Sequence, residues 1–309
     1  MSQKLDLGAR GEFACLLFDS TFKIVICNPE NEDLLIGIIE LLLPGKHIQN
    51  ITFVNKERHG LVISEKNVTF DMLCKDKDTG EEFLVEVQNA PQDSYRDRML
   101  SYATYPIREQ LELKVKKLQE TDEVNRMDYS LKPVYVLSFI NFKLKHETLD
   151  AIEDGYVSRY ELRNRHNAEL MTPALNFVFV EMGRMELKSS DKEKCKTLLE
   201  RFVFSLKYMH TFTTEPDGFQ DELLKKLFHA SRVANMTVTE RENYQKAMRT
   251  EIDRYAELAY AHKEGHEEGH KQGLQEGRIL TAKAMLADGI PAEKIMAYTG
   301  LTAEELESL

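Results

Sequence analysis

Two apolar runs separated by a polar turn constrain the fold of this chain most strongly. The first run, NVTFDMLCKD, spans residues 67–76, and the second, EFLVEVQN, spans residues 82–89. In the first run apolar side chains recur at every second residue, which is the period of a strand with one buried face. Asp78, Thr79 and Gly80 between the runs are typical turn residues. The sequence therefore predicts a β-hairpin.

Helical and extended segments alternate along much of the remaining chain. The predicted elements, in chain order, are a helix over 30–43, a strand or extended segment over 48–55, the hairpin, a helix over 93–118 that breaks or kinks near Pro106, strands over 132–144 and 174–182, a helix over 188–210, and a mostly helical region over 215–260. This order predicts an α/β fold with a mixed sheet core flanked by helices and a helical C-terminal extension.

We expect two parts, a core domain over residues 1–250 and a helical unit over residues 251–309. Four glycines of the second part recur at a spacing of four: Gly265, Gly269, Gly273 and Gly277. This spacing is close to one helical turn, so the glycines form a stripe along a helix, where each costs roughly 1 kcal/mol relative to alanine. Polar neighbours favour a solvated helix, and small side chains favour the close approach of a second one. We therefore expect a homodimer through the C-terminal helices.

The end of the chain reads as three short helical segments. Gly289 and Pro291 separate the first two, and Thr302 with Glu305 forms a capping box at the start of the third. Such a unit can be a DNA-binding helix-turn-helix, although its acidity favours contact with protein instead. Histidines also recur every fourth residue upstream, at His262, His266 and His270. That spacing can bind metal, but on so polar a helix we expect them to be solvated.

Charge and cysteine content narrow the class of protein. Of the net charge of −11, residues 251–309 contribute −6, from 12 acidic and 6 basic side chains, and the remaining residues contribute −5. Because phosphate binding needs local positive charge, this balance by itself does not indicate DNA. Four scattered cysteines without a Cys/His cluster argue against structural zinc and fit a reducing compartment. No apolar run is long enough to cross a bilayer and the N-terminus lacks a hydrophobic signal core, so we expect a cytoplasmic protein without a membrane part.

The hairpin carries a candidate reaction centre. Glu86 stands between Val85 and Val87 in an otherwise apolar strand, and a buried carboxylate is very costly unless it is paired, hydrogen-bonded or bound to metal. Gln88 lies two residues later on the same face, and Asp71 lies in the facing strand. Two convergent carboxylates with few bases nearby suit Mg²⁺ or Mn²⁺, which can activate water for phosphoryl chemistry, with Gln88 orienting that water. Each acid taken alone also fits a plain structural role as a polar strand residue.

The hairpin and the segment after it contain an ordered set of residues. The set is an Asp, a turn with Gly, an E-x-Q motif between apolar residues, and then a helix with Arg, Tyr and a later Gln. Its members are Asp71, Gly80, Glu86, Gln88, Arg98, Tyr102 and Gln110. This set resembles the pattern of the recombination-promoting nuclease / putative transposase family of the PD-(D/E)XK superfamily, in which the motif is (V/I)E(M/V)Q. The segment over 20–60 and the glycine-stepped tail also resemble the family, so the resemblance covers most of the chain.

The resemblance implies a restriction-endonuclease-like core and Mg²⁺-dependent cleavage of DNA. Asp71 and Glu86 would be metal ligands, and Asp33 (or Glu32) in the first helix would complete the metal site. Gln88 stands where the superfamily usually has Lys, and an amide brings neither the charge nor the basicity of an amine.

The helix after the hairpin supplies three further candidates. The resemblance implies that Arg98, Tyr102 and Gln110 contact the phosphate or brace the active site. Arg98 and Tyr102, four residues apart on one helix, also fit a plain packing or surface pair.

Two hypotheses about function follow from these features. The first is an active, metal-dependent DNA endonuclease that promotes recombination or transposition-like events, or acts as a defence or toxin nuclease. The second is a catalytically degenerate PD-(D/E)XK-fold interaction protein, for which the acidic balance and Gln88 leave room. Geometry separates them, because the first requires Asp71 and Glu86 to lie within reach of one metal ion.

Overall fold

The computed structural model describes residues 11–54, 57–58, 68–69, 71–120 and 128–309. Contacts divide the chain into two compact units, Met1–Ala247 and Met248–Leu309. The helix α6 (Val238–Ala287) runs through the division without a break. Each unit contains its own cluster of buried apolar side chains.

The first unit is built on a six-stranded mixed sheet with the order β1-β4-β5-β6-β8-β7. Strands β5, β6 and β8 run parallel, and the other pairs are antiparallel. The strands are β1 (Ile51–Val54), β4 (Met72–Asp76), β5 (Glu82–Gln88), β6 (Val134–Ile140), β7 (Val157–Glu161) and β8 (Leu175–Glu181), and a separate two-stranded sheet joins β2 (Glu57–Arg58) to β3 (Val68–Thr69). The mixed sheet agrees with the predicted α/β class.

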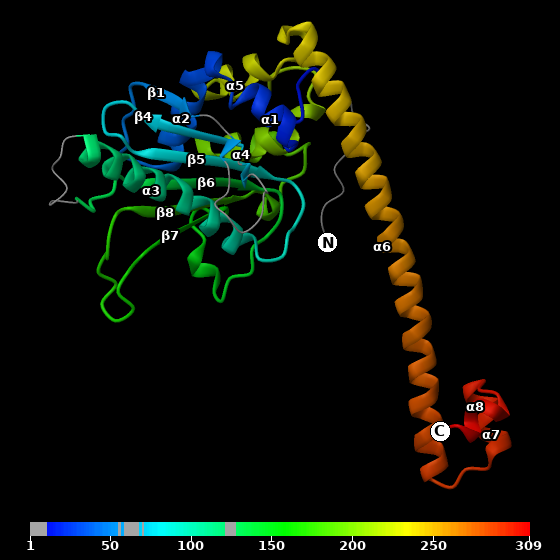
Figure 1. Ribbon diagram of the computed structural model, residues 1–309. Coiled ribbons are helices and arrows are strands. Elements are labelled where there is room, and N and C mark those ends of the chain that lie inside the picture. The colour runs from blue at the N-terminus through cyan, green and yellow to red at the C-terminus, as the bar shows by residue number, and fades with distance from the viewer. Residues whose placement is uncertain (1–10, 55–56, 59–67, 70, 121–127) are drawn as a thin grey trace. The chain divides into compact units, whose positions relative to one another are not determined.

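Helices cover both faces of this sheet (Figure 1). On one face, α3 (Tyr95–Glu120) packs Met99 and Ala103 against β5 and β6 through Leu84 and Ile140. The other face carries aromatic contacts: rings of α1 (Asp19–Val25) and α4 (Leu198–Tyr208) lie 5.7 and 6.0 Å from the ring of Phe139 on β6. The remaining helices of this unit are α2 (Glu32–Leu42) and α5 (Glu222–Ser231), with 3-10 turns at Pro29–Asn31, Leu149–Ala151, Met182–Arg184, Lys192–Lys194, Met209–Thr211 and Val233–Asn235.

The predicted hairpin is present as β4 and β5, paired from Met72 opposite Val85 to Lys75 opposite Glu82. Its turn is held by Asp76, whose carboxylate accepts bonds from the Asp78 amide at 2.9 Å and the Thr79 hydroxyl at 2.8 Å. Gly80 adopts φ +75°, a conformation that glycine takes without a Cβ clash. Of the first predicted strand, residues 67 and 70 lie outside the described part of the chain. Val68–Thr69 form β3, which pairs with β2, and β4 begins at Met72.

Four segments differ from the sequence prediction. Helix α3 continues through the buried Pro106 without breaking, which shows that packing against the sheet outweighs the lost backbone bond. The helix predicted over 188–210 begins only at Leu198, where Thr197 and Glu200 form a capping box. Helix α1 and the edge strand β7 were not predicted, since both are short and polar on one side.

A buried lysine should make the stability of this unit depend on pH. Lys207 donates to the carbonyl oxygens of Met182 and Met185 at 3.1 Å each, and burial, reinforced by Lys143, lowers its pKa from 10.5 to about 8. Between these two pH values the unfolded chain binds a proton that the native protein lacks, so stability rises with pH. We expect wild type to gain roughly 1 kcal/mol relative to Lys207→Met between pH 7.5 and 9.5, measured by urea denaturation. A difference that does not change with pH would contradict this.

The second unit contains the end of α6, α7 (Ala292–Thr299) and α8 (Ala303–Glu307). Its small core is formed by Ala282, Ile295, Leu301 and Leu306. The predicted capping box at Thr302 is present. The stepped glycines of α6 have open space where a Cβ would be, and the three stepped histidines are exposed. Within the described ranges, no helix combines the length and apolar character needed to cross a membrane.

Candidate active site

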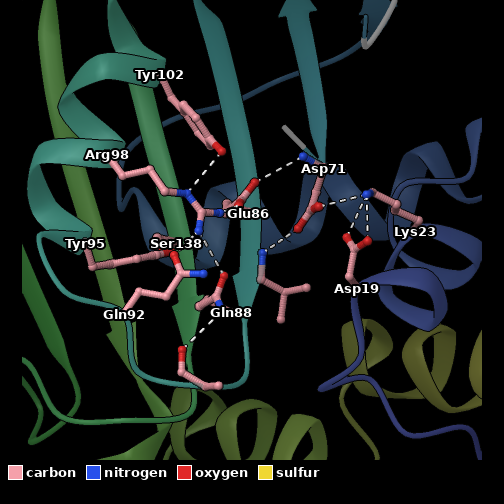
Figure 2. Close-up of polar contacts among 12 residues, drawn as sticks. Asp19, Lys23, Asp71, Glu86, Gln88, Gln92, Tyr95, Arg98, Tyr102 and Ser138 are labelled. Atoms are coloured by element: carbon pink, nitrogen blue, oxygen red, sulfur yellow. Dashed lines mark hydrogen bonds and ion pairs between the residues drawn. The ribbon is translucent and has the colours of Figure 1, made fainter. Parts of the chain in front are cut away.

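The site lies where the hairpin strands β4 and β5 meet α1 on one side and α3 on the other (Figure 2). Asp71 immediately precedes Met72, whose partner is Val85, so it stands opposite Glu86. The Asp71 amide donates to Glu86 Oε2 at 3.1 Å, and the Val87 amide donates to Asp71 Oδ2 at 2.7 Å. The two predicted acids are therefore brought together, and each is fixed by backbone of the hairpin.

Both carboxylates are almost completely buried, with 5% of Asp71 and 3% of Glu86 exposed. Burial raises the pKa of Asp71 to about 9, with further increases from a hydrogen bond to Asp19 and from the charge of Glu86, while Lys23 opposes them. Burial also raises the pKa of Glu86, and the charge of Arg98 opposes that shift. Two acids in such a place cannot both ionise easily unless a cation compensates them.

Helix α1 places an acid and a base beside Asp71. Asp19 and Lys23 are one helical turn apart, and the Lys23 ammonium lies 2.7 Å from Asp19 Oδ1 and 3.0 Å from Asp71 Oδ1. Burial by itself lowers the pKa of Lys23, but the charges of Asp71 and Asp19 raise it well above its usual range. The lysine is thus a permanent positive charge in the site.

Helix α3 supplies a second cation. Arg98 Nη2 is bonded to Glu86 Oε1, and Arg98 Nε donates to the Tyr102 hydroxyl at 3.0 Å. The same guanidinium donates to the side-chain oxygens of Gln88, at 3.3 Å, and Gln92. Arg98 thus contacts Tyr102 on its own helix and also Glu86 and Gln88 of β5.

The structure places two other predicted site residues elsewhere. Asp33 is at the first turn of α2, with 63% of its side chain exposed, and pairs with Lys226 of α5 at 2.8 Å. Gln110 is buried, and its amide exchanges hydrogen bonds with the backbone of Lys132 at 2.8 and 3.3 Å. Gln110 thus braces the segment before β6, at the opposite end of β5 from Gln88.

Sequence reasoning missed Asp19 and Lys23 because no helix was predicted over 19–25. Their spacing of four residues, with the acid first, is the pattern of a stabilising helical ion pair and was the available signal. Gln92 was also missed, since it lies outside regular secondary structure. What links all three to the site is tertiary contact.

The oxygen atoms of this site are of the kind that binds a divalent cation, but the side chains are not positioned around a common point. Carboxylate oxygens are the ligands that Mg²⁺ and Mn²⁺ prefer. As the side chains stand, however, no three Asp, Glu, His or Cys side chains among the described residues are grouped to hold a metal ion. Asp71 and Glu86 are the two that could begin such a site.

The contact between Arg98 and Glu86 gives a testable result. Arg98→Met would leave Glu86 buried without its counter-ion, so we expect a loss of about 2 kcal/mol in the free energy of unfolding. The matched control is Arg108→Met on the same helix, because Arg108 pairs with Glu112 at the surface and should contribute less than about 1 kcal/mol. Thermal denaturation of both variants checks this, and equal losses would refute a special role for Arg98.

Comparison with known proteins gives two family matches. Residues 16–261 match the family described as "PD-(D/E)XK nuclease family transposase", and residues 275–309 match the "Rpn/YhgA-like nuclease family, C-terminal HTH domain". No curated protein and no solved structure matches the chain. The first match covers most of the chain and agrees with the resemblance carried by the hairpin. The second supports the helix-turn-helix interpretation of the terminal segments.

Proposed function

Since the chain belongs to the PD-(D/E)XK nuclease family of transposases, we propose that it is a divalent-metal-dependent DNA endonuclease that hydrolyses phosphodiester bonds. The observation that carries this proposal is the buried pair of Asp71 and Glu86, locked together by backbone hydrogen bonds across the hairpin. Burying two acids side by side costs stability, and such costly arrangements concentrate at functional sites.

Asp71 and Glu86 are the proposed ligands of Mg²⁺ or Mn²⁺, and Asp19 is the proposed third acid in place of Asp33. Asp19 contacts Asp71 and influences the pKa of Glu86, whereas Asp33 is engaged by Lys226. When bound, such an ion would supply positive charge to a developing phosphoryl transition state and lower the pKa of a bound water. The acids of the chain would hold the ion, and the surrounding backbone would keep them in place.

The remaining residues of the site would act by orientation. Arg98 fixes Glu86 and the Gln88 oxygen, while the Gln88 amide nitrogen donates to the Ala90 carbonyl at 3.1 Å. A glutamine held at both ends of its amide is preorganised to position water or phosphate. It cannot itself supply a positive charge.

The second unit is proposed to assist DNA contact through its helix-turn-helix domain, residues 275–309. The negative charge of this unit limits the contribution that we expect from it, because phosphates repel acids.

We also propose a homodimer through the glycine stripe of α6, where the space beside each glycine is open. Light scattering of the full chain should then give twice the monomer mass, and a monomer at micromolar concentration would refute the dimer.

The proposed biological role of cleavage is to promote recombination or a transposition-like event. The same cleavage could instead serve defence, as a toxin nuclease does. The test is conversion of supercoiled plasmid to nicked or linear DNA by the purified chain in Mg²⁺, and the loss of this conversion in EDTA.

A second candidate function, that of a non-catalytic interaction protein, is favoured by one observation: all four carboxylate oxygens of Asp71 and Glu86 already have protein partners. Intact plasmid under all metal conditions would favour that candidate.

A further inference from the structure

Lys23 and Arg98 pair with the carboxylate oxygens of Asp71 and Glu86 that a metal ion would need as ligands. Asp71 Oδ2 and Glu86 Oε2 accept backbone amides, so their other oxygens, Oδ1 and Oε1, face away from the hairpin backbone bonds. Lys23 binds Oδ1 of Asp71 at 3.0 Å, and Arg98 binds Oε1 of Glu86. The two oxygens best placed for an external cation are thus each held by an internal one (Figure 2).

The two bases are not equally anchored. Arg98 has further bonds to Tyr102, Gln88 and Gln92, and its planar guanidinium is fixed by them. Within the described part of the chain, the hydrogen bonds and ion pairs of the Lys23 side chain go only to Asp19 and Asp71. Its ammonium sits on a flexible four-carbon stem and remains 27% exposed, so it can move away without disturbing the sheet.

The net charge of the cluster favours a divalent ion that replaces Lys23 over one that binds beside it. In the metal-bound cluster the ligands must be ionised, so Asp19, Asp71 and Glu86 carry −3, and Lys23 and Arg98 would add +2 if both stayed. A divalent ion that replaces the lysine makes the cluster neutral, whereas an ion added beside the lysine makes it positive. In a buried site the neutral arrangement is the less costly one.

We propose that Lys23 is an exchangeable internal counter-ion: it holds Asp19 and Asp71 in the metal-free protein, and a divalent cation takes its place between them. This rests on the proposed metal site and adds the residue that sets its affinity.

The test is the affinity of the full chain for Mn²⁺, measured by calorimetry and by the free-ion EPR signal. Lys23→Met should bind Mn²⁺ at least about tenfold more tightly than wild type, because the ion no longer competes with the ammonium. Lys46→Met is the matched control, since Lys46 pairs with Glu81 at 2.6 Å and is 28% exposed, and it should bind as wild type does. Lys23→Arg keeps the charge and should remain within about threefold of wild type.

The melting temperature provides a second readout besides the affinity for Mn²⁺. In EDTA, Lys23→Met should melt below wild type, and saturating Mn²⁺ should raise its melting temperature by more than it raises that of wild type. Equal or weaker Mn²⁺ binding by Lys23→Met overturns the exchange while leaving the metal site intact. Absence of binding in wild type and in every variant overturns both the exchange and the proposed metal-dependent function.

Discussion

Asp71→Asn is expected to abolish DNA cleavage and, in the absence of metal, to make the protein more stable. The substitution removes a proposed metal ligand, so the cleavage rate should fall by at least about 100-fold. It also removes a carboxyl group that is buried beside Glu86 and Asp19, while its amide oxygen can still accept the Val87 amide bond. We expect the free energy of unfolding in EDTA to rise by about 1 to 3 kcal/mol.

The gain from Asp71→Asn should depend on pH. Because the folded pKa of Asp71 is raised to about 9, the native protein keeps a proton that the unfolded chain loses above about pH 4. Asp71 therefore lowers the free energy of unfolding of the wild type as the pH rises between these two pKa values. Asp71→Asn has no such loss. Urea denaturation in EDTA at pH 5 and pH 8 should show a larger advantage of the variant at pH 8.

The control for this result is another buried acid of the same hairpin. Asp76 holds the turn through Asp78 and Thr79, so Asp76→Asn should lower stability and leave cleavage within a few-fold of wild type. If Asp71→Asn were the less stable protein at both pH values, Asp71 would be a structural residue and the metal assignment would lose its support.

Divalent cations are expected to stabilise the wild-type protein strongly. An ion that binds only the native state at 100 times its dissociation constant adds about 2.7 kcal/mol, which corresponds to roughly 5 to 10 °C in melting temperature for a domain of this size. The rise should be absent in Asp71→Asn and in Glu86→Gln. Differential scanning calorimetry with Mg²⁺ or Mn²⁺, reversed by EDTA, measures it.

A general effect of salt has to be separated from binding. The same measurement with K⁺ at matched ionic strength should give no comparable rise, because a monovalent ion does not match the charge of the cluster. An equal rise in wild type and in both variants would mean that the ions act elsewhere on the protein.

Local signals were sufficient to predict that the two acids of the hairpin lie close together. The turn at Asp78–Gly80 fixes the pairing of β4 with β5, and a single acid between Val85 and Val87 marks a position that needs a partner. Once the hairpin register is set, Asp71 must face Glu86. The role of Arg98 followed from its place in the family pattern and is consistent with its bond to Glu86.

Residues that join the site through tertiary packing could not be predicted in the same way. The family resemblance made Asp33 in the first predicted helix the candidate. The short helix α1, whose Phe22 packs against Phe139 of the sheet, instead brings Asp19 to Asp71. Gln110 fits the family pattern by spacing, yet its side chain serves the backbone of Lys132. The pattern of apolar and polar residues along the sequence does not predict either of these side-chain contacts.

The most direct test of the account is the rate of supercoiled plasmid cleavage in Mg²⁺ by wild type, Glu86→Gln and Glu82→Gln. Glu82 lies on the same strand and is also buried, but it pairs with Lys75 away from the site, so it is a matched control. We expect cleavage by wild type and Glu82→Gln, and a rate at least about 100-fold lower for Glu86→Gln. Cleavage by Glu86→Gln as fast as by the other two proteins would contradict the assignment of Asp71 and Glu86 as the catalytic centre.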